Sequence, residues 1–409
     1  MARRKDGRVQ EVNRIAAGDG TGGAGVGAAT AGGTGTTLVT APPQYSSAIG
    51  RARHDVETPA LILDLDVARR NIAEMARRVG TMPVKLRPHV KLHKSPQIAR
   101  MQMDAGAIGV STATVWEAIV MARAGIPNIL IANQVVGKGK LAALADAAHL
   151  TLITVAVDDA RNLDDLSAAA QAAGSQIGVL IEIDTGMNRS GTRSEEEARG
   201  LAAHASRLPG LRLLGVMGYE GHCMLEPDRD LRVTKAHAAM EYLIHVVDVL
   251  AAAGFDSPVV SAGGTGTFDI TGRNPRVTEL QAGSYVFMDA FHGSLVPDFG
   301  IALTVLATVI SRHGDLIILD VGRKAIGSDL TMPRLVGEVG ELIYLNEEHA
   351  GVRVGPDAAL QVGDCVELVT GYGPTTVNLY DAYHVVSDGV VVDVWPVPAR
   401  GYGPLGALS

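Results

Sequence analysis

Between residues 56 and 298 the sequence alternates short apolar runs with amphipathic stretches, and this alternation limits the fold more than any other feature. Runs such as NILIAN and GVLIEI are almost continuously apolar, which is typical of strands covered on both faces of a parallel sheet. The candidate strands are 61–65, 84–91, 107–111, 128–133, 152–157, 177–184, 211–219, 258–263 and 279–287. Nine strands at the spacing of βα units predict an α/β fold, a (β/α)₈ TIM-like barrel with one outlying strand. The alternative is an open doubly wound sheet, which needs fewer strands.

Helical patterns fill most intervals between these strands. Apolar side chains recur there every three or four residues, which marks one face of a helix. Two such stripes are Ile72, Met75 and Val79, and Ala236, Met240, Ile244 and Val247.

The two ends of the chain follow other patterns. Residues 1–50 include a low-complexity stretch of Gly, Ala and Thr and are expected to form a flexible tail, because such residues bury little apolar area. From about residue 299 the pattern becomes strand-like, and Asp388-Gly389 between two valine-rich runs predicts a hairpin. We therefore expect a barrel over 51–298 and an antiparallel β domain over 299–409.

Charge and composition exclude several classes of protein. The chain has 36 Lys+Arg against 44 Asp+Glu, a net charge of −8, which argues against binding nucleic acid or an anionic membrane. Two cysteines are too few for a disulfide scaffold, and no apolar run reaches the length of a membrane span. The N-terminal residues lack the apolar core of a secretory signal. We expect a cytoplasmic protein with reduced cysteines.

The segment LRPHVKLHKS, residues 86–95, carries the first chemical signal. Side chains alternate along a strand, so Arg87, His89 and Lys91 would share one face. A lysine crowded by cations has a lowered pKa and becomes an amine nucleophile, suited to a Schiff base with an aldehyde cofactor such as pyridoxal phosphate. The alternative is a solvated basic loop.

A second signal is the glycine-rich turn SAGGTGT, residues 261–267. Glycine lets backbone N–H groups approach a phosphate, and threonine hydroxyls add donors. Gly263, Gly264 and Thr265 are the candidates, although many such turns bind nothing.

The lysine segment resembles that of the D-threonine aldolase and D-serine dehydratase family, fold-type III enzymes with an alanine racemase-like N-terminal barrel. The resemblance extends over residues 57–401. It implies that pyridoxal 5′-phosphate is bound covalently through Lys91, with His89 beside it. Lys94 would then be a surface or supporting cation.

Three more candidates come from matching segments. IEIDTGMNRSG resembles the strand whose arginine approaches the phenolic oxygen of the cofactor, which would be Arg189; the alternative is a structural pair with Asp184. In GVMGYEGHCM, Tyr219 resembles the residue that packs on the pyridine ring. His222 is left open as a cofactor neighbour, an acid/base or a structural residue.

The last barrel strand adds the remaining cofactor candidates. By resemblance Gln281 lies opposite the pyridine nitrogen, where a neutral partner leaves the cofactor a weaker electron sink. The backbone N–H groups of Ser284 and Tyr285 would complete the phosphate cup, together with the turn at 263–265. The alternative for Tyr285 is packing between the two domains.

The resemblance fails at the divalent-metal site of the family. A His, and two residues later an Asp or Cys, precede a Thr-x-Asn-Leu-type strand there. Tyr372 and Pro374 occupy these positions here. Proline has no side-chain donor and tyrosine is a poor ligand for a hard ion. We expect no metal at this site, with Tyr372 or His222 as the catalytic base; His384 is a remote ligand candidate.

The alanine racemase pattern fails as well. Its catalytic tyrosine would fall near residues 320–324, where there is none. Lys324 and Asp329 are instead polar residues that could reach the active site of a neighbouring subunit. A homodimer is expected from the resemblance.

These observations predict a pyridoxal-phosphate-dependent lyase acting on a β-hydroxy D-amino acid, cleaving it to an aldehyde and glycine as D-threonine aldolase does. One alternative is a D-serine or hydroxyaspartate dehydratase, in which Lys91 removes the Cα proton. Others are an amino-acid racemase, epimerase or transaldolase, a non-catalytic pyridoxal-phosphate-binding protein, and a barrel protein without cofactor.

Overall fold

Eight parallel strands form the first sheet of the protein. The structure is a computed structural model that describes residues 43–355 and 358–403. The strand order is β2-β9-β8-β7-β6-β5-β4-β3, and a parallel bridge between His89 and Ser111 joins the two outer strands. The predicted (β/α)₈ barrel is confirmed. The strands are β2 (Lys85–Leu86), β3 (Val110–Thr112), β4 (Ile129–Ile131), β5 (Ile153–Val157), β6 (Ile177–Glu182), β7 (Leu211–Met217), β8 (Val259–Ala262) and β9 (Glu279–Leu280).

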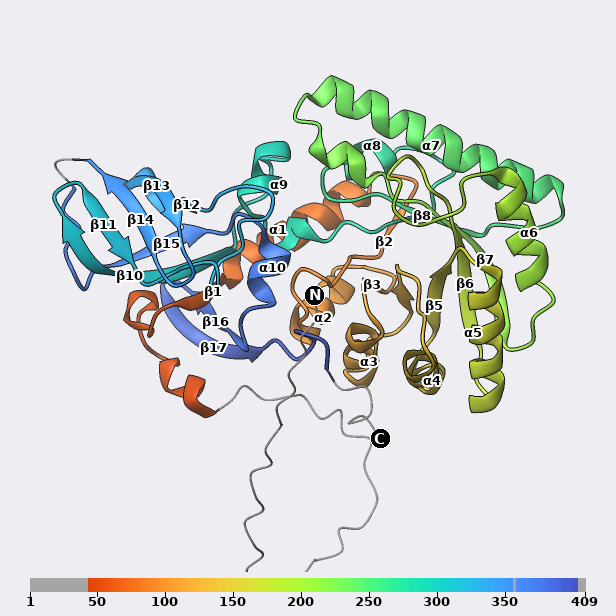
Figure 1. Ribbon diagram of the computed structural model, residues 1–409, viewed down its shortest axis with the longest axis horizontal. Helices are drawn as coiled ribbons and strands as arrows, with labels where there is room; N and C mark the ends of the chain where they lie inside the picture. The colour runs from red at the N-terminus through yellow and green to blue at the C-terminus, as the bar shows by residue number, and fades with distance from the viewer. Residues whose placement is uncertain (1–42, 356–357, 404–409) are drawn as a thin grey trace, which may run out of the picture. The chain divides into compact units, whose positions relative to one another are not determined.

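Helices follow the strands and cover the outside of the barrel, as α3 to α6 show in Figure 1. Both predicted apolar stripes lie on the inner faces of helices, with Ile244 partly buried and the other members buried. Within the two described ranges no helix is both long and apolar enough to cross a membrane. The helices are α1 (Leu65–Val79), α2 (Pro96–Asp104), α3 (Val115–Arg123), α4 (Lys138–Ala147), α5 (Ala160–Ala173), α6 (Glu195–Ala205), α7 (Arg229–Ala252), α8 (Phe268–Thr271) and α9 (Ala290–Leu295).

The second sheet is formed mostly by the C-terminal residues and is largely antiparallel. Its main order is β13-β14-β11-β10-β1-β16-β17, with β15 pairing β10 and β12. Asp388 and Gly389 both have positive φ in the turn between β16 and β17, as predicted for a hairpin. The elements are β10 (Leu303–His313), β11 (Leu316–Leu319), β12 (Arg334–Leu335), β13 (Gly340–Leu345), β14 (Ala350–Val354), β15 (Cys365–Val369), α10 (Gly373–Val377), β16 (Ala382–Ser387) and β17 (Val390–Pro396).

The outlying ninth strand is the first one, β1 (Ala60–Asp64). It lies in the second sheet, antiparallel to β10 and parallel to β16. Its apolar side chains are buried on both faces, so its sequence looks like that of a barrel strand. Only the pairing distinguishes β1 from the barrel strands.

Most of the expected tail, residues 1–42, lies outside the described residues. Pro43–Ala48 forms a 3-10 helix, and the Gly50 N–H donates to the carbonyl oxygen of Val391 at 2.8 Å. The expected limits of the barrel and the β domain, 51–298 and 299–409, stay predictions.

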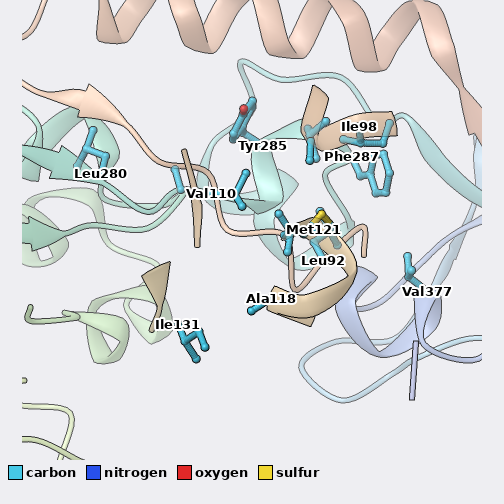
Figure 2. Close-up of a cluster of buried hydrophobic side chains, with 14 of the residues drawn as sticks. Leu92, Ile98, Val110, Ala118, Met121, Ile131, Leu280, Tyr285, Phe287 and Val377 are labelled. Atoms are coloured by element: carbon cyan, nitrogen blue, oxygen red, sulfur yellow. The ribbon is translucent and has the colours of Figure 1, made fainter. Parts of the chain in front are cut away.

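One hydrophobic core connects the two sheets. It extends from barrel residues such as Ile131 and Leu280 to Val377 of α10. Figure 2 shows part of this core, with Leu92, Tyr285 and Phe287 among its members. Because Leu92 is buried directly after Lys91, core packing fixes the backbone that carries the lysine.

Candidate active site

A cavity of about 260 Å³ opens where the barrel strands end. Its lining residues lie at or after the ends of β2, β3, β4, β6, β7, β8 and β9, and α9 and the start of α10 complete it. The carboxyl ends of the strands are where barrel enzymes carry their active sites. The lining includes ten of the predicted residues: His89, Lys91, Arg189, Tyr219, Gly263, Gly264, Thr265, Gln281, Ser284 and Tyr372.

Two predicted residues do not line the cavity. Tyr285 is completely buried, and its hydroxyl accepts a hydrogen bond from Gln102 Nε2 at 2.9 Å. The His222 ring lies against Gly186 and is 3.6 Å from the Cys223 sulfur, and its Nδ1 is buried without a partner.

Lys91 is partly buried and makes no ion pair within the described part of the chain. Its Nζ lies 5.8 Å from the centre of the Tyr219 ring. Burial lowers the pKa of Lys91, and the Arg189 charge lowers it further, against a smaller opposing effect of Glu117. The lysine therefore reaches its neutral, nucleophilic form at a lower pH than an exposed lysine.

The other two long cations of this segment are paired. Arg87 Nε and Nη2 donate to the two carboxylate oxygens of Glu279, each at 2.9 Å, and Lys94 Nζ pairs with Glu117. Both cations are buried, so a surface position for Lys94 and a solvated basic loop are wrong. Lys91 therefore owes its lowered pKa first to burial rather than to Arg87.

His89 is buried beside Lys91 and faces the same cavity. Burial and the positive charge of Lys91 hold the pKa of His89 well below its ordinary value. Its Nδ1 accepts a hydrogen bond from the Lys91 backbone N–H at 3.3 Å. His89 therefore contributes a neutral imidazole.

Arg189 is the exposed cation of the cavity, with 51% of its side chain accessible. Its guanidinium carbon lies 5.8 Å from the centre of the Tyr219 ring. Its Nη2 is 3.9 Å from Glu182, and the alternative partner Asp184 lies beside Arg193 at 3.7 Å. The guanidinium is thus available to a ligand in the cavity.

The glycine turn forms one wall, but its N–H groups are partly used within the protein. Gly263 has φ +82° and donates to Glu220 at 3.1 Å, and Gly264 donates to Thr267 Oγ1 at 3.2 Å. A Cβ on Gly264 would lie 3.1 Å from Tyr219, so glycine allows the turn to approach the ring.

Glu220 holds this turn from behind and was missed in the sequence. It is completely buried and also accepts hydrogen bonds from Thr267 at 2.7 Å and Thr271 at 2.5 Å. Its position directly after Tyr219 was the only available signal, since its partners lie more than forty residues away.

The turn after β9 contributes a side-chain donor. The Ser284 hydroxyl makes no hydrogen bond to the residues that the structure describes, and it faces the cavity. The Tyr285 N–H donates to Thr265 Oγ1 at 3.1 Å, and Gln281 Nε2 donates to Ser261 Oγ at 2.9 Å. Ser284 is therefore the freer donor, and Gln281 is held in a fixed orientation.

Tyr372 and His292 form the wall opposite the barrel strands. Their rings are stacked, with centres 6.0 Å apart and an angle of 17°. Burial and nearby Asp289 raise the pKa of Tyr372. His292 was missed in the sequence, where its only signal is an aspartate three residues earlier, at the N-cap of α9.

Metal ligation has little support in this geometry. His384 does not line the cavity, and its ring lies 5.9 Å from that of Tyr45. Among residues 43–355 and 358–403 there is no group of three His, Cys, Asp or Glu side chains arranged for a metal ion. The expected loss of the metal site stays a prediction.

Two family models match the chain. A model of the alanine racemase N-terminal domain matches residues 63–290, and one of a putative serine dehydratase domain matches residues 302–386. The two matches divide the chain between the barrel and the second sheet.

Known proteins resemble the chain over most of its length. D-threonine aldolase of Arthrobacter sp. is 39% identical, covering 85% of this chain and 93% of that protein. The 3-hydroxy-D-aspartate aldolase of Paracoccus denitrificans is 36% identical, covering 87% and 95%. The crystal structure of D-threonine aldolase from Filomicrobium marinum superimposes with a TM-score of 0.84 at 38% identity, covering 86% and 98%.

Proposed function

The chain belongs to the alanine racemase-type family that includes D-threonine aldolase and 3-hydroxy-D-aspartate aldolase, and from this we propose that it is a pyridoxal 5′-phosphate-dependent lyase acting on β-hydroxy D-amino acids. It would cleave the Cα–Cβ bond and release an aldehyde and glycine. The observation that carries the proposal is Lys91, a partly buried amine without a carboxylate partner, in one cavity with Arg189 and Tyr219.

The residues around the cavity fit this cofactor. A cofactor aldehyde needs an amine of lowered pKa, which is Lys91, and a pyridine ring needs a flat neighbour, which is Tyr219. A phosphate needs donors, which the Ser284 hydroxyl and the Thr265 N–H, directly after Gly264, would supply. When bound, the cofactor supplies an electron sink for the electron pair left on the substrate Cα.

Each of these side chains has a separate part in the reaction. Lys91 would hold the cofactor and exchange it for the substrate amine. The Arg189 guanidinium, beside Tyr219, would stabilise negative charge that develops on the ligand. Gln281, fixed by Ser261, would give the pyridine nitrogen a neutral partner.

Cleavage also needs a base for the β-hydroxyl proton. The sequence candidates are Tyr372 and His222. The raised pKa of Tyr372 keeps its phenol protonated, which favours donating a proton over accepting one. His222 does not line the cavity, although its ring lies nearby against Gly186.

Other parts of the proposal rest on the sequence and the family. The substrate would be a small amino acid, and the protein a cytoplasmic homodimer that works without the divalent metal. Metal analysis after treatment with a chelator tests the last part: we expect full activity, and strong reactivation by manganese or zinc would refute it.

A dehydratase is the second candidate. The match of residues 302–386 to a putative serine dehydratase domain favours it. In that reaction Lys91 would take the Cα proton while the hydroxyl group leaves Cβ.

A product screen distinguishes these functions. The protein, loaded with pyridoxal phosphate, is incubated with D-threonine, D-phenylserine, D-serine and D-alanine. An aldehyde with glycine supports the lyase, an oxo acid the dehydratase, and inverted alanine a racemase. Absence of all products would favour a non-catalytic pyridoxal-phosphate-binding protein, and failure to take up the cofactor would refute the whole proposal.

A further inference from the structure

His292 is the one histidine of the cavity lining that the sequence analysis did not consider. It lies in α9, is 6% exposed, and faces the cavity that also contains Lys91. Its imidazole is held from two sides, by a carboxylate and by an aromatic ring.

The carboxylate is Asp289. His292 Nδ1 lies 2.8 Å from Asp289 Oδ1, and that carboxylate is buried. A carboxylate only accepts hydrogen bonds, so Nδ1 carries a hydrogen, and in the neutral imidazole Nε2 then carries the lone pair. Asp289 is itself fixed, because its Oδ2 accepts the Gly373 N–H at 2.9 Å.

The lone pair is accessible. Nε2 of His292 has no hydrogen-bond partner among the described residues, and it is not one of their buried unpartnered polar atoms. Tyr372, stacked on the ring, limits its rotation. A histidine whose Nδ1 is anchored by a carboxylate and whose Nε2 is open to a ligand site has the geometry of a general base.

We propose that His292, oriented by Asp289, is the general base that takes the β-hydroxyl proton of the substrate. The assignment rests on the proposed lyase function. Nε2 removes the proton, the O–H electron pair becomes the second bond of the aldehyde carbonyl, and the Cα–Cβ bond breaks. Its electron pair stays on Cα, and protonation of Cα gives glycine. His292 is then a catalytic residue and Asp289 a positioning residue.

Replacement of the base with chemical rescue tests this assignment. In His292→Ala we expect kcat for D-phenylserine cleavage to fall by about 10²–10⁴-fold, the usual contribution of general base catalysis. Added imidazole should restore part of the activity by entering the space left by the ring. In Asp289→Asn we expect a fall in kcat that imidazole does not rescue, because the His292 ring still fills the site.

Two controls separate a chemical role from a structural one. His245→Ala removes an exposed histidine that pairs with Glu195 and should leave kcat unchanged. Exchange of the Cα hydrogen of D-alanine with deuterated solvent needs no β-hydroxyl, so His292→Ala should retain it, together with cofactor absorbance.

Three results would overturn the assignment. They are an unchanged kcat in His292→Ala, an equal loss of cleavage and of Cα exchange, or loss of cleavage without any rescue. A wild-type protein that exchanges the Cα hydrogen but releases no aldehyde would instead refute the lyase function, and this assignment with it. That failure is visible in the wild type before any variant is made.

Discussion

Lys91 and Lys94 lie three residues apart in the same segment, but only one of the two side chains has a carboxylate partner. Lys94 is buried against α3 and paired with Glu117. Lys91 faces the cavity, with Arg189 and the Tyr219 ring nearby and no carboxylate beside it. Lys94 is the more deeply buried of the two, so burial alone does not make a lysine reactive.

The charged group nearest to each lysine determines whether its amine is stabilised in the charged or the neutral form. A carboxylate in contact with an amine favours its charged form, whereas burial and a second cation favour its neutral form. Arg87 resembles Lys94 in this respect, because it has a carboxylate partner, Glu279, to which it donates two hydrogen bonds. The protein thus neutralises two cations of one segment and leaves a third without a counterion.

The largest effect that this contrast predicts is on Lys91. Lys91→Ala should lose covalent cofactor attachment and lower turnover by a factor on the order of 10⁶, as removal of a covalent nucleophile does in other enzymes. Borohydride reduction followed by peptide mapping should label Lys91 in the wild type and nothing in the variant. Lys138→Ala, at an exposed lysine, is the control. A label on Lys94 would contradict this prediction, because it would show that the paired lysine binds the cofactor.

The second largest effect is expected for the buried ion pair between Lys94 and Glu117. Lys94→Met should lower the free energy of unfolding by about 3–5 kcal/mol, because it leaves the Glu117 carboxylate buried and unpaired. Urea denaturation measures the change. Replacing both partners, as Lys94→Met with Glu117→Leu, should recover much of the loss. The exposed Lys324–Glu348 pair is the matched control, and Lys324→Met should have no measurable effect.

Removal of the second cation should have a smaller effect. In Arg189→Gln we expect kcat to fall roughly 10²-fold, the loss seen when one charge-stabilising donor is removed. The pKa of Lys91 should rise toward its ordinary value, so cofactor uptake should need a higher pH than in the wild type. Arg193→Gln is the control, since Arg193 is the neighbouring exposed arginine. Identical pH profiles for uptake would show that burial alone lowers the pKa.

The smallest effect concerns the stability of the cofactor-free protein. A lysine whose pKa is lowered in the folded state binds fewer protons there than in the unfolded state, so unfolding becomes less favourable as the pH rises toward 10.5. Lys91→Met removes this dependence. It should raise the melting temperature at neutral pH, by an amount that shrinks as the pH approaches 10.5. A constant difference across this range would contradict a lowered pKa.

The sequence predicted the barrel well because the signal for its strands is local. Apolar runs and helical stripes depend on neighbouring residues, and both reappear in the structure. The position of β1 was not predictable in this way, since its apolar run suits either sheet. Its place depends on pairing with β10 and β16, which lie more than two hundred residues away.

The residues of the candidate site also differ in whether their signal is local in the sequence or depends on distant segments. Lys91, Arg189 and Tyr219 stand in recognisable segments, and the structure brings them into one cavity. Glu220 and His292 are ordinary residues in the sequence, because the partners of Glu220 and the ring stacked on His292 come from distant segments. The N–H of Tyr285 is taken by Thr265, a contact that depends on how two separate turns meet.

The place of β1 also limits which part of this chain can be exchanged as a unit. The second sheet needs β1 between β10 and β16, although β1 is encoded before the whole barrel. A recombination that transfers only residues 299–409 would therefore join a foreign sheet to a resident central strand. We expect a chimaera to keep the native pairing when residues 60–64 are exchanged together with the C-terminal segment, because the second sheet is built from two separate parts of the chain.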